Sequence, residues 1–266
     1  MNKLCLTAGT EIPDIIWSAN VLIALRRANP ALTLSWECPR VEISSWLESY
    51  PELDAVICDL EEVDAPAPDY LILHPLWCKV KTAGPGPIGD LYMLADRWCN
   101  PPDPLPVRPY LPPSLGNLTP PPGLPEGYLC LDPSMGGRGA LGEALTTAWT
   151  NFIAHMGLPV VQVGRPEASQ LPGSIDARGC GAGETARLAC HARLCLGADG
   201  DLSCLAHALQ KRQIWLEVKH SSWWWPRGEP PLCVRHRMET LEDLDAPALY
   251  QLAQGLLAAP ESGHGQ

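Results

Sequence analysis

The chain has 266 residues, enough for one large domain or two small ones with a substantial core. Nearly half of the residues are apolar, yet no apolar run reaches the ~18 residues of a membrane-spanning helix. The net charge of -11 argues against broad electrostatic binding to nucleic acid or to anionic membranes, although a local basic patch remains open.

The N-terminal sequence MNKLCLTAGTEIPD lacks the apolar segment of about 7–15 residues that a signal peptide needs, so we expect a cytoplasmic protein. The 11 cysteines are spaced singly along the chain, without a CxxC pair, and the closest grouping is Cys190-His191 with Cys195. A zinc site would need four ligands at recognisable spacing. We therefore expect buried thiols in a reducing compartment and no metal site.

The first 74 residues alternate between strand and helix patterns. Apolar runs predict strands, whereas apolar residues at three- and four-residue spacing predict helices. The short links favour parallel βαβ pairing. The predicted strands are 3–8, 32–36, 55–60 and 70–74, and the predicted helices are 14–27 and 41–49.

Asp14 is the first residue with a chemical role to consider. It lies in the first turn of a helix that follows the first strand and a glycine-containing loop. In an open parallel sheet this point faces the ligand crevice at the carboxyl ends of the strands. The alternative is that Asp14 only complements the helix dipole, which is worth ~0.5 kcal/mol.

Proline dominates the middle of the chain. Residues 101–125 contain eleven prolines, a density that forbids helix and central strand and favours extended polyproline II structure. Interleaved Leu, Val and Tyr favour an ordered crossing over a disordered tether. We place a domain boundary near Pro122, which gives domains 1–122 and 123–266, and we predict a short helix at 90–98.

The second half repeats the α/β pattern. Strands are predicted at 127–131 and 160–163, and helices at 141–156 and 241–257. A glycine-rich loop after the first of these strands carries one cation, Arg138, which could contact a phosphate. Such a loop is a weak signal, because it can also be a surface turn. Glu167 lies just beyond the strand 160–163.

The stretch from 184 to 215 has the pattern of a helix, a buried strand (194–196), a tight Gly-Ala-Asp-Gly-Asp turn (197–201) and a second helix, and a further predicted strand at 213–218 closes the unit. This is half of a doubly wound α/β domain. The strand-to-helix turn of such a domain attracts anionic groups through free N–H groups and the helix dipole. Asp199 and Asp201 have N-capping as their alternative role.

Three adjacent tryptophans, Trp223 to Trp225, cannot all face one side. An exposed indole at Trp224 or Trp225 would stack on a sugar or nucleobase, and Arg227 could meet a phosphate. A packing plug between domains is an equally weighted alternative, because Trp is mostly buried.

Five segments, in order along nearly the whole chain, resemble the family-9 glycosyltransferases, the ADP-heptose:lipopolysaccharide heptosyltransferases. Three of them are the Asp14 helix, Val163-Gly164-Arg-Pro-Glu167, and the segment from Leu196 to Leu209, which resembles the family's Gly-Asn-Asp-Thr-Gly signature. The other two are Trp46-Leu47-Glu48 with Pro51 to Ile57, and Tyr128 to Pro133 at the start of the C-terminal domain. The resemblance implies a GT-B architecture, in which two Rossmann-like α/β domains with parallel sheets face a cleft.

The resemblance further implies inverting transfer of a sugar from a nucleotide-diphosphate sugar to an acceptor hydroxyl, without metal or other cofactor. Asp14 would be the general base. The helix after Gly200, together with Arg138, would stabilise the leaving diphosphate, and Glu167 would bind the ribose hydroxyls. The expected partners are the donor and a saccharide or other hydroxyl acceptor. The expected donor-binding residues are Arg138, Glu167, Asp199, Gly200 and Asp201, and the expected acceptor or stacking residues are Trp224, Trp225 and Arg227.

The chain also departs from the family pattern. Pro13 stands where the family has glycine, Cys204 where it has histidine, and Asp132-Pro133-Ser134 replaces His-Pro-Gly with no lysine after it. Asp201 would repel a diphosphate unless its side chain turns away. Two alternatives therefore stay open: transfer to a hydroxymethylated nucleobase in DNA, and a degenerate, non-catalytic GT-B module that binds a nucleotide-sugar or a partner.

Overall fold

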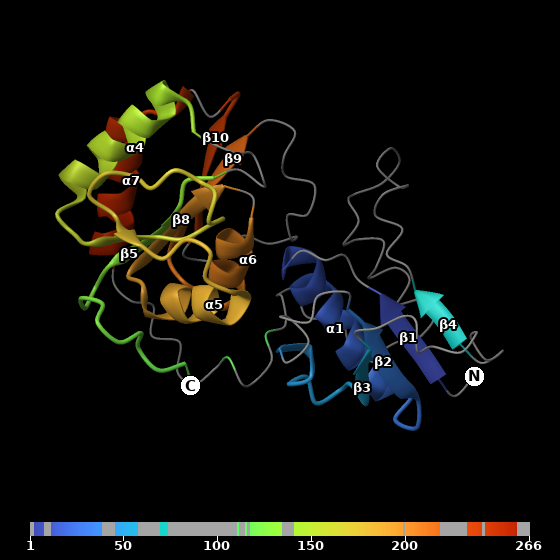
Figure 1. The fold of residues 1–266 in the computed structure, drawn as a ribbon. Coiled ribbons are helices and arrows are strands. Elements are labelled where there is room, and N and C mark those ends of the chain that lie inside the picture. The colour runs from blue at the N-terminus through green and yellow to red at the C-terminus, as the bar shows by residue number, and fades with distance from the viewer. Residues whose placement is uncertain are drawn as a thin grey trace. The chain divides into compact units, whose positions relative to one another are not determined.

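A computed structural model of the chain describes residues 3–7, 12–38, 46–57, 70–73, 111, 115, 118–134, 141–198, 200–218, 233–240 and 243–259 (Figure 1). These residues divide into two compact units, one formed mainly by Met1–Leu118, with Gly181–Gly183 among its later residues, and one formed by most residues from Thr119 onward. Each unit contains its own parallel sheet. The expected α/β class is confirmed.

The first unit has a four-stranded sheet in the order β3-β2-β1-β4, and every pairing is parallel. Helix α1 (Ile12–Ala28) connects β1 to β2. The four predicted strands and the first predicted helix are confirmed to within a few residues. The strands are β1 (Lys3–Thr7), β2 (Thr33–Glu37), β3 (Ala55–Ile57) and β4 (Tyr70–Leu73).

Helix α1 forms because apolar residues recur on one of its faces. Ile15, Ala19 and Leu22 are fully buried, at the four- and three-residue spacing that lines one side of a helix. At its C-terminal end the guanidinium of Arg26 donates to the carbonyl of Leu32 at 2.7 Å and pairs with Asp54 at 2.7 Å. These bonds tie the end of α1 to the segments on both sides of β2.

Parts of the predicted first half lie outside the described residues. These are residues 41–45 of the predicted helix 41–49, the predicted helix 90–98, and most of the proline-rich stretch. The division of the chain between Leu118 and Thr119 falls within that stretch.

The second unit has a six-stranded parallel sheet in the order β10-β9-β8-β5-β6-β7. From β5 the chain builds outward through β6 and β7, and from β8 it builds outward in the other direction. The order therefore reverses between β5 and β8, which makes the sheet doubly wound. The strands are β5 (Leu129–Asp132), β6 (Val160–Gln162), β7 (Ile175–Asp176), β8 (Leu194–Ala198), β9 (Gln213–Val218) and β10 (Cys233–Met238).

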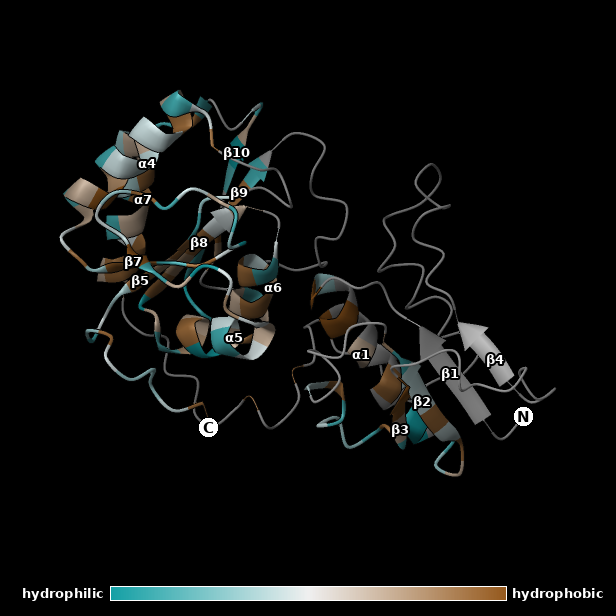
Figure 2. Cartoon of the chain, viewed as in Figure 1, coloured by the Kyte–Doolittle hydropathy of each residue, from teal (hydrophilic) through white to brown (hydrophobic). Residues whose placement is uncertain are grey.

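Helices cover both faces of this sheet (Figure 1). Helices α4 (Glu143–Met156) and α7 (Ala246–Ala258) pack on the face that carries Leu129, Leu131 and Leu196. Helices α5 (Ala182–His191) and α6 (Asp201–Ala208) pack on the face that carries Cys130 and Cys195. Figure 2 shows the apolar strands lying between these helices. Within the described part of the chain, no helix is both long enough and apolar enough to cross a membrane.

Four elements differ from the sequence prediction. Strand β7 was not predicted, because it is only two residues long. Strand β10 was not predicted, because Arg235, His236 and Arg237 interrupt its apolar pattern. Helix α7 begins at Ala246 and not at residue 241, because Asp245 caps it by accepting from the Ala248 N–H at 3.2 Å. Strand β8 continues to Ala198, so the first two residues of the predicted turn at 197–201 belong to the strand.

Candidate functional site

The carboxyl edge of β5 and β8 is the candidate site in the second unit. Asp132 is the last residue of β5 and lies in register beside Gly197 of β8. The strand order reverses between these two strands. In doubly wound sheets such a reversal opens the crevice in which ligands bind.

Three glycines from different elements surround the Asp132 side chain. A Cβ atom added at Gly164 would lie 2.9 Å from Asp132 Oδ1, and one added at Gly197 would lie 3.3 Å from the Asp132 carbonyl oxygen. At Gly200 an added Cβ would be 3.8 Å from Asp132 Oδ2. Gly164 also has a φ of +112°, which disfavours any other residue. Gly164 and Gly200 thus place no side chain beside the carboxyl group, and Gly197 allows β8 to lie close to the backbone of Asp132.

The Asp132 carboxyl group has an unusual protonation equilibrium. Its Oδ1 accepts from the Ser134 N–H at 2.9 Å and from the Ser134 hydroxyl at 2.5 Å. Burial nevertheless raises the pKa of Asp132 to about 6, although the Ser134 hydrogen bonds and the charge of Arg165 lower it. A pKa near the working pH in a ligand crevice is typical of functional sites.

Helix α6 begins at the same edge of the sheet. Its N-cap is Gly200, which has no side chain to cap the helix. The Ser203 hydroxyl donates to the carbonyl of Ala198 at 2.7 Å and so ties the first turn of α6 to the end of β8. A helix N-terminus presents backbone N–H groups and a partial positive charge to an anion. The N-capping interpretation of Asp201 is wrong, because Gly200 occupies that position.

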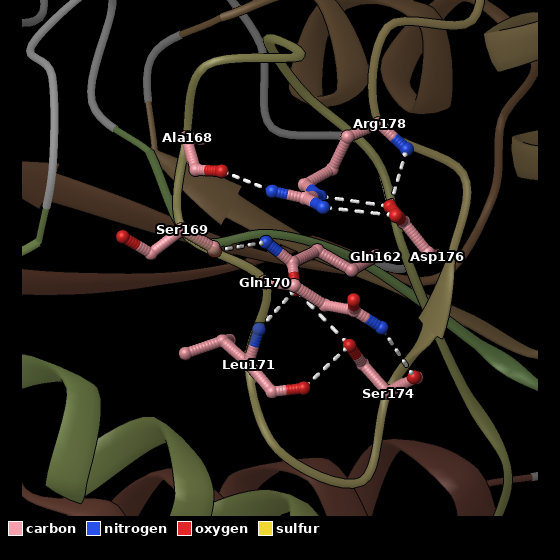
Figure 3. A network of polar contacts seen from close by, with 8 residues as sticks. All are labelled: Gln162, Ala168, Ser169, Gln170, Leu171, Ser174, Asp176 and Arg178. Atoms are coloured by element: carbon pink, nitrogen blue, oxygen red, sulfur yellow. Dashed lines mark hydrogen bonds and ion pairs between the residues drawn. The ribbon is translucent and has the colours of Figure 1, made fainter.

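The loop between β6 and β7 carries Glu167 and is held from inside by Gln162 (Figure 3). The Gln162 side chain is 0% exposed. Its Oε1 accepts from the Leu171 N–H at 2.7 Å and from the Ser174 hydroxyl at 3.1 Å, and its Nε2 donates to the Ser169 carbonyl at 2.9 Å. One side chain thus links three points of the loop.

Arg178 fastens the same loop from its other side (Figure 3). Its guanidinium pairs with both carboxylate oxygens of Asp176, at 2.8 and 2.9 Å, and donates to the carbonyl of Ala168. Asp176 has its pKa lowered to about 2, mainly by the hydrogen bonds from Arg178. Glu167 precedes Ala168 and is exposed, so a constrained loop presents its carboxylate to solvent.

The predicted site residues fall into three groups. Gly200 and Asp201 lie at the start of α6, with Gly200 close to Asp132, and Glu167 lies on the loop that follows β6 in the same unit. Asp14 lies in the first turn of α1, as expected, but its side chain is outside the described part of the structure. The remaining predicted residues lie outside the described residues altogether: Arg138, Asp199, Trp224, Trp225 and Arg227.

Sequence reasoning missed two members of this site, Asp132 and Arg165. An acidic residue that ends a buried apolar strand was the available signal for Asp132, and Arg165 was visible between Gly164 and Glu167. Cys204 is 0% exposed, so its thiol is buried in α6 and does not line the crevice. Among the described residues, no three His, Cys, Asp or Glu side chains lie together where they could hold a metal ion.

Comparison with known proteins gives matches in structure but none in sequence. No protein-family model matches the chain, and no curated protein matches its sequence. Escherichia coli heptosyltransferase WaaC with ADP superposes with a TM-score of 0.68 over 95% of this chain and 97% of that one, at 13% identity. The fold is that of the GT-B glycosyltransferases.

Two further structures agree with this assignment. The family-9 glycosyl transferase from Veillonella parvula has a TM-score of 0.67, with 13% identity, and the match covers 96% of this chain and 97% of that one. E. coli ADP-heptose lipopolysaccharide heptosyltransferase II also has a TM-score of 0.67 at 13% identity, over 96% and 98% of the two chains. The resemblance seen in the sequence motifs is thereby confirmed at the level of fold.

Proposed function

We propose that this protein is a glycosyltransferase that moves a sugar from a nucleotide-diphosphate sugar to an acceptor hydroxyl with inversion. The observation that carries the proposal is the carboxyl edge of the second sheet. At that edge, α6 begins at its N-cap Gly200, close to the point where the strand order reverses. The fold is similar to that of a heptosyltransferase over 95% of this chain. An N-terminus in that place suits the diphosphate of a nucleotide-sugar.

In the proposed reaction the acceptor oxygen bonds to the anomeric carbon of the sugar while the bond from that carbon to the diphosphate oxygen breaks. Asp14 is the proposed general base and takes the proton of the acceptor hydroxyl. The nucleoside diphosphate leaves with the bonding electron pair. Backbone N–H groups at the start of α6 stabilise its charge without a metal ion.

The proposed donor contacts follow from the same edge of the sheet. Glu167, exposed on its constrained loop, accepts hydrogen bonds from the ribose hydroxyls. Arg165, two residues earlier, is an exposed cation that interacts electrostatically with Asp132, and it can also offset phosphate charge. Arg138 and Asp199 remain proposed donor contacts on the basis of the sequence motifs.

The acceptor is proposed to be a saccharide, as in the motif resemblance. No described feature favours a hydroxymethylated base in DNA, and the net charge of -11 opposes DNA binding. One observation does favour a non-catalytic, ligand-binding module as a second candidate. Two acidic residues, Asp132 and Asp201, lie beside the expected diphosphate position.

The test combines binding with transfer. Thermal-shift measurements of the full chain with ADP-, UDP- and GDP-sugars, in EDTA, should show stabilisation by one nucleotide class. The best donor is then incubated with oligosaccharide acceptors, and the products are weighed by mass spectrometry for addition of one sugar. Stabilisation without any transfer would support the non-catalytic module, and stabilisation by none of the donors would refute the proposed function.

A further inference from the structure

The inference concerns Asp132 and rests on the proposed function. A carboxyl group lies at the strand-order reversal, next to the helix end where the donor diphosphate is proposed to bind. An ionised carboxylate in that place would repel the phosphates. The sequence therefore puts an acidic residue where the proposed chemistry calls for a neutral or positive one.

The geometry shows which oxygen of Asp132 meets the ligand. Oδ1 accepts both hydrogen bonds from Ser134, and it is the oxygen closest to Gly164. Oδ2 is the oxygen closest to Gly200, the N-cap of α6. Oδ2 is therefore the atom that can carry a proton toward an anion at the start of α6.

Gly164 and Gly200 leave room for a phosphate group beside the Asp132 carboxyl group. A side chain at Gly164 would collide with Oδ1, and a side chain at Gly200 would lie within 3.8 Å of Oδ2. Gly197 lies beside Asp132 in the register of the sheet, and its added Cβ would be 3.5 Å from the Asp132 Cβ. Among the described residues, Gly164 and Gly200 thus place no side chain next to the carboxyl group, as an approaching ligand group requires.

The surroundings favour a neutral carboxyl group once an anion binds. Four titratable groups of the described part of the chain bear on Asp132. Arg165 from the β6–β7 loop favours the ionised form, Cys130 on β5 and Cys180 before α5 couple to it weakly, and Asp201 begins α6 beside Gly200. Without ligand, burial already raises the pKa of Asp132 to about 6, and a bound diphosphate would raise it further.

We propose that Asp132 binds the donor diphosphate as a neutral carboxylic acid, with Oδ2–H donating to a phosphate oxygen, so that donor binding takes up one proton. The proton adds to the carboxylate oxygen from solvent, and no bond of the donor is made or broken. Asp132 is thus a donor-specificity residue that couples binding to pH. The coupling makes the protein bind its donor best in mildly acidic conditions.

The test is isothermal titration calorimetry of the full chain with the nucleotide-sugar selected by thermal shift. This ligand is suitable because its diphosphate is esterified at both ends and keeps a constant charge over the pH range used. Titrations in buffers of different ionisation enthalpy, with EDTA, count the protons taken up. The affinity of the wild type should fall about fiftyfold between pH 6 and pH 8, with uptake of about one proton at pH 8.

Asp132→Asn is the decisive variant, because its amide is neutral at every pH and its nitrogen can donate in place of Oδ2–H. It should bind with an affinity at pH 8 close to that of the wild type at pH 6, and without proton uptake. Glu126→Gln is the matched control, since it removes one exposed carboxylate before β5, at the opposite edge of the sheet. It should keep the pH dependence of the wild type.

Three results would overturn the inference. Wild-type affinity that does not change with pH, or an Asp132→Asn variant that retains the wild-type pH profile, would refute it and leave the glycosyltransferase proposal standing. Recovery of wild-type affinity at pH 8 by added Mg²⁺, without proton uptake, would make Asp132 a metal ligand and refute proton uptake. Absence of binding by every nucleotide-sugar at every pH would refute both this inference and the proposed function.

Discussion

At the scale of single residues, Asp132 combines a constraint on stability with a role in binding. Asp132 is half-buried, with its carboxyl group beside Gly164 and Gly200, and the hydrogen bonds that this group accepts from described residues come from Ser134. Ionising Asp132 in the folded protein therefore lowers the free energy of unfolding. For the same reason, an approaching anion readily shifts the group to its protonated form.

This cost predicts a pH-dependent stability. The pKa of Asp132 is about 6 in the folded state and near 3.8 when unfolded. The free energy of unfolding therefore falls as the pH rises from about 4 to 6, and the loss is complete above that range. Asp132→Asn should be more stable than the wild type by about 1–2 kcal/mol at pH 8, after allowance for partial exposure, and by almost nothing at pH 4. Urea unfolding at both pH values measures the difference. An equal gain at both would show that the effect is packing and not ionisation.

Asp14 offers a second test at this scale. If it is the general base, Asp14→Asn should lower the turnover number by about 10²–10⁴-fold and leave donor affinity nearly unchanged. The physical reason is that an amide keeps the shape of the side chain but cannot take a proton. Single-turnover mass spectrometry measures the rate, with Glu48→Gln, which removes an exposed carboxylate elsewhere in the first unit, as the control. Full turnover by Asp14→Asn would exclude the role.

At the scale of elements, the loop between β6 and β7 replaces the helix that usually connects parallel strands. It keeps its form through the side chains of Gln162 and Arg178, each of which bonds to backbone atoms within the loop (Figure 3). The sequence did not indicate this, because Gln162 is a polar residue within an apolar strand pattern. Its burial is favourable only because the loop folds back to satisfy both ends of its amide.

The loop predicts a coupled effect on stability and binding. Gln162→Met keeps the volume but leaves buried backbone groups of the loop without a partner, so the free energy of unfolding should fall by about 1–3 kcal/mol. Donor affinity should fall as well, because the loop no longer holds Glu167 in place. A double-mutant cycle with Glu167→Ala, measured by calorimetry, tests this route. If Gln162 acts through Glu167, the two losses in affinity will not add, whereas additive losses would contradict the coupling.

At the scale of the whole molecule, the second unit contains a complete fold. Both of its apolar clusters, one on each face of the sheet, draw only on residues beyond position 123. Its sheet is doubly wound, and its helices cover both faces. The proposed donor contacts that the structure describes also belong to this unit.

Residues 119–266 should therefore fold alone. We expect a single cooperative unfolding transition and an affinity for the nucleotide-sugar within about threefold of the full chain, but no transfer, because Asp14 is in the other unit. Calorimetry of the isolated segment measures both quantities. A segment that is unfolded, or that has lost its affinity, would show that the first unit contributes to the core or to the donor site.

The sequence by itself determined the alternation of strands and helices, the parallel pairing and the glycine turn before α6, because these depend on local spacing of apolar and glycine residues. It also indicated the GT-B fold through the order of five short motifs. Strand β10 was not predicted from the sequence, because its charged residues interrupt the apolar pattern of a strand. Only the tertiary structure brought Asp132 together with Gly164, Gly197 and Gly200, because these residues belong to segments far apart in the chain that become neighbours when β5 pairs with β6 and β8. Burial at that junction, a property of the packed sheet and of no local pattern, is what shifts the pKa of Asp132.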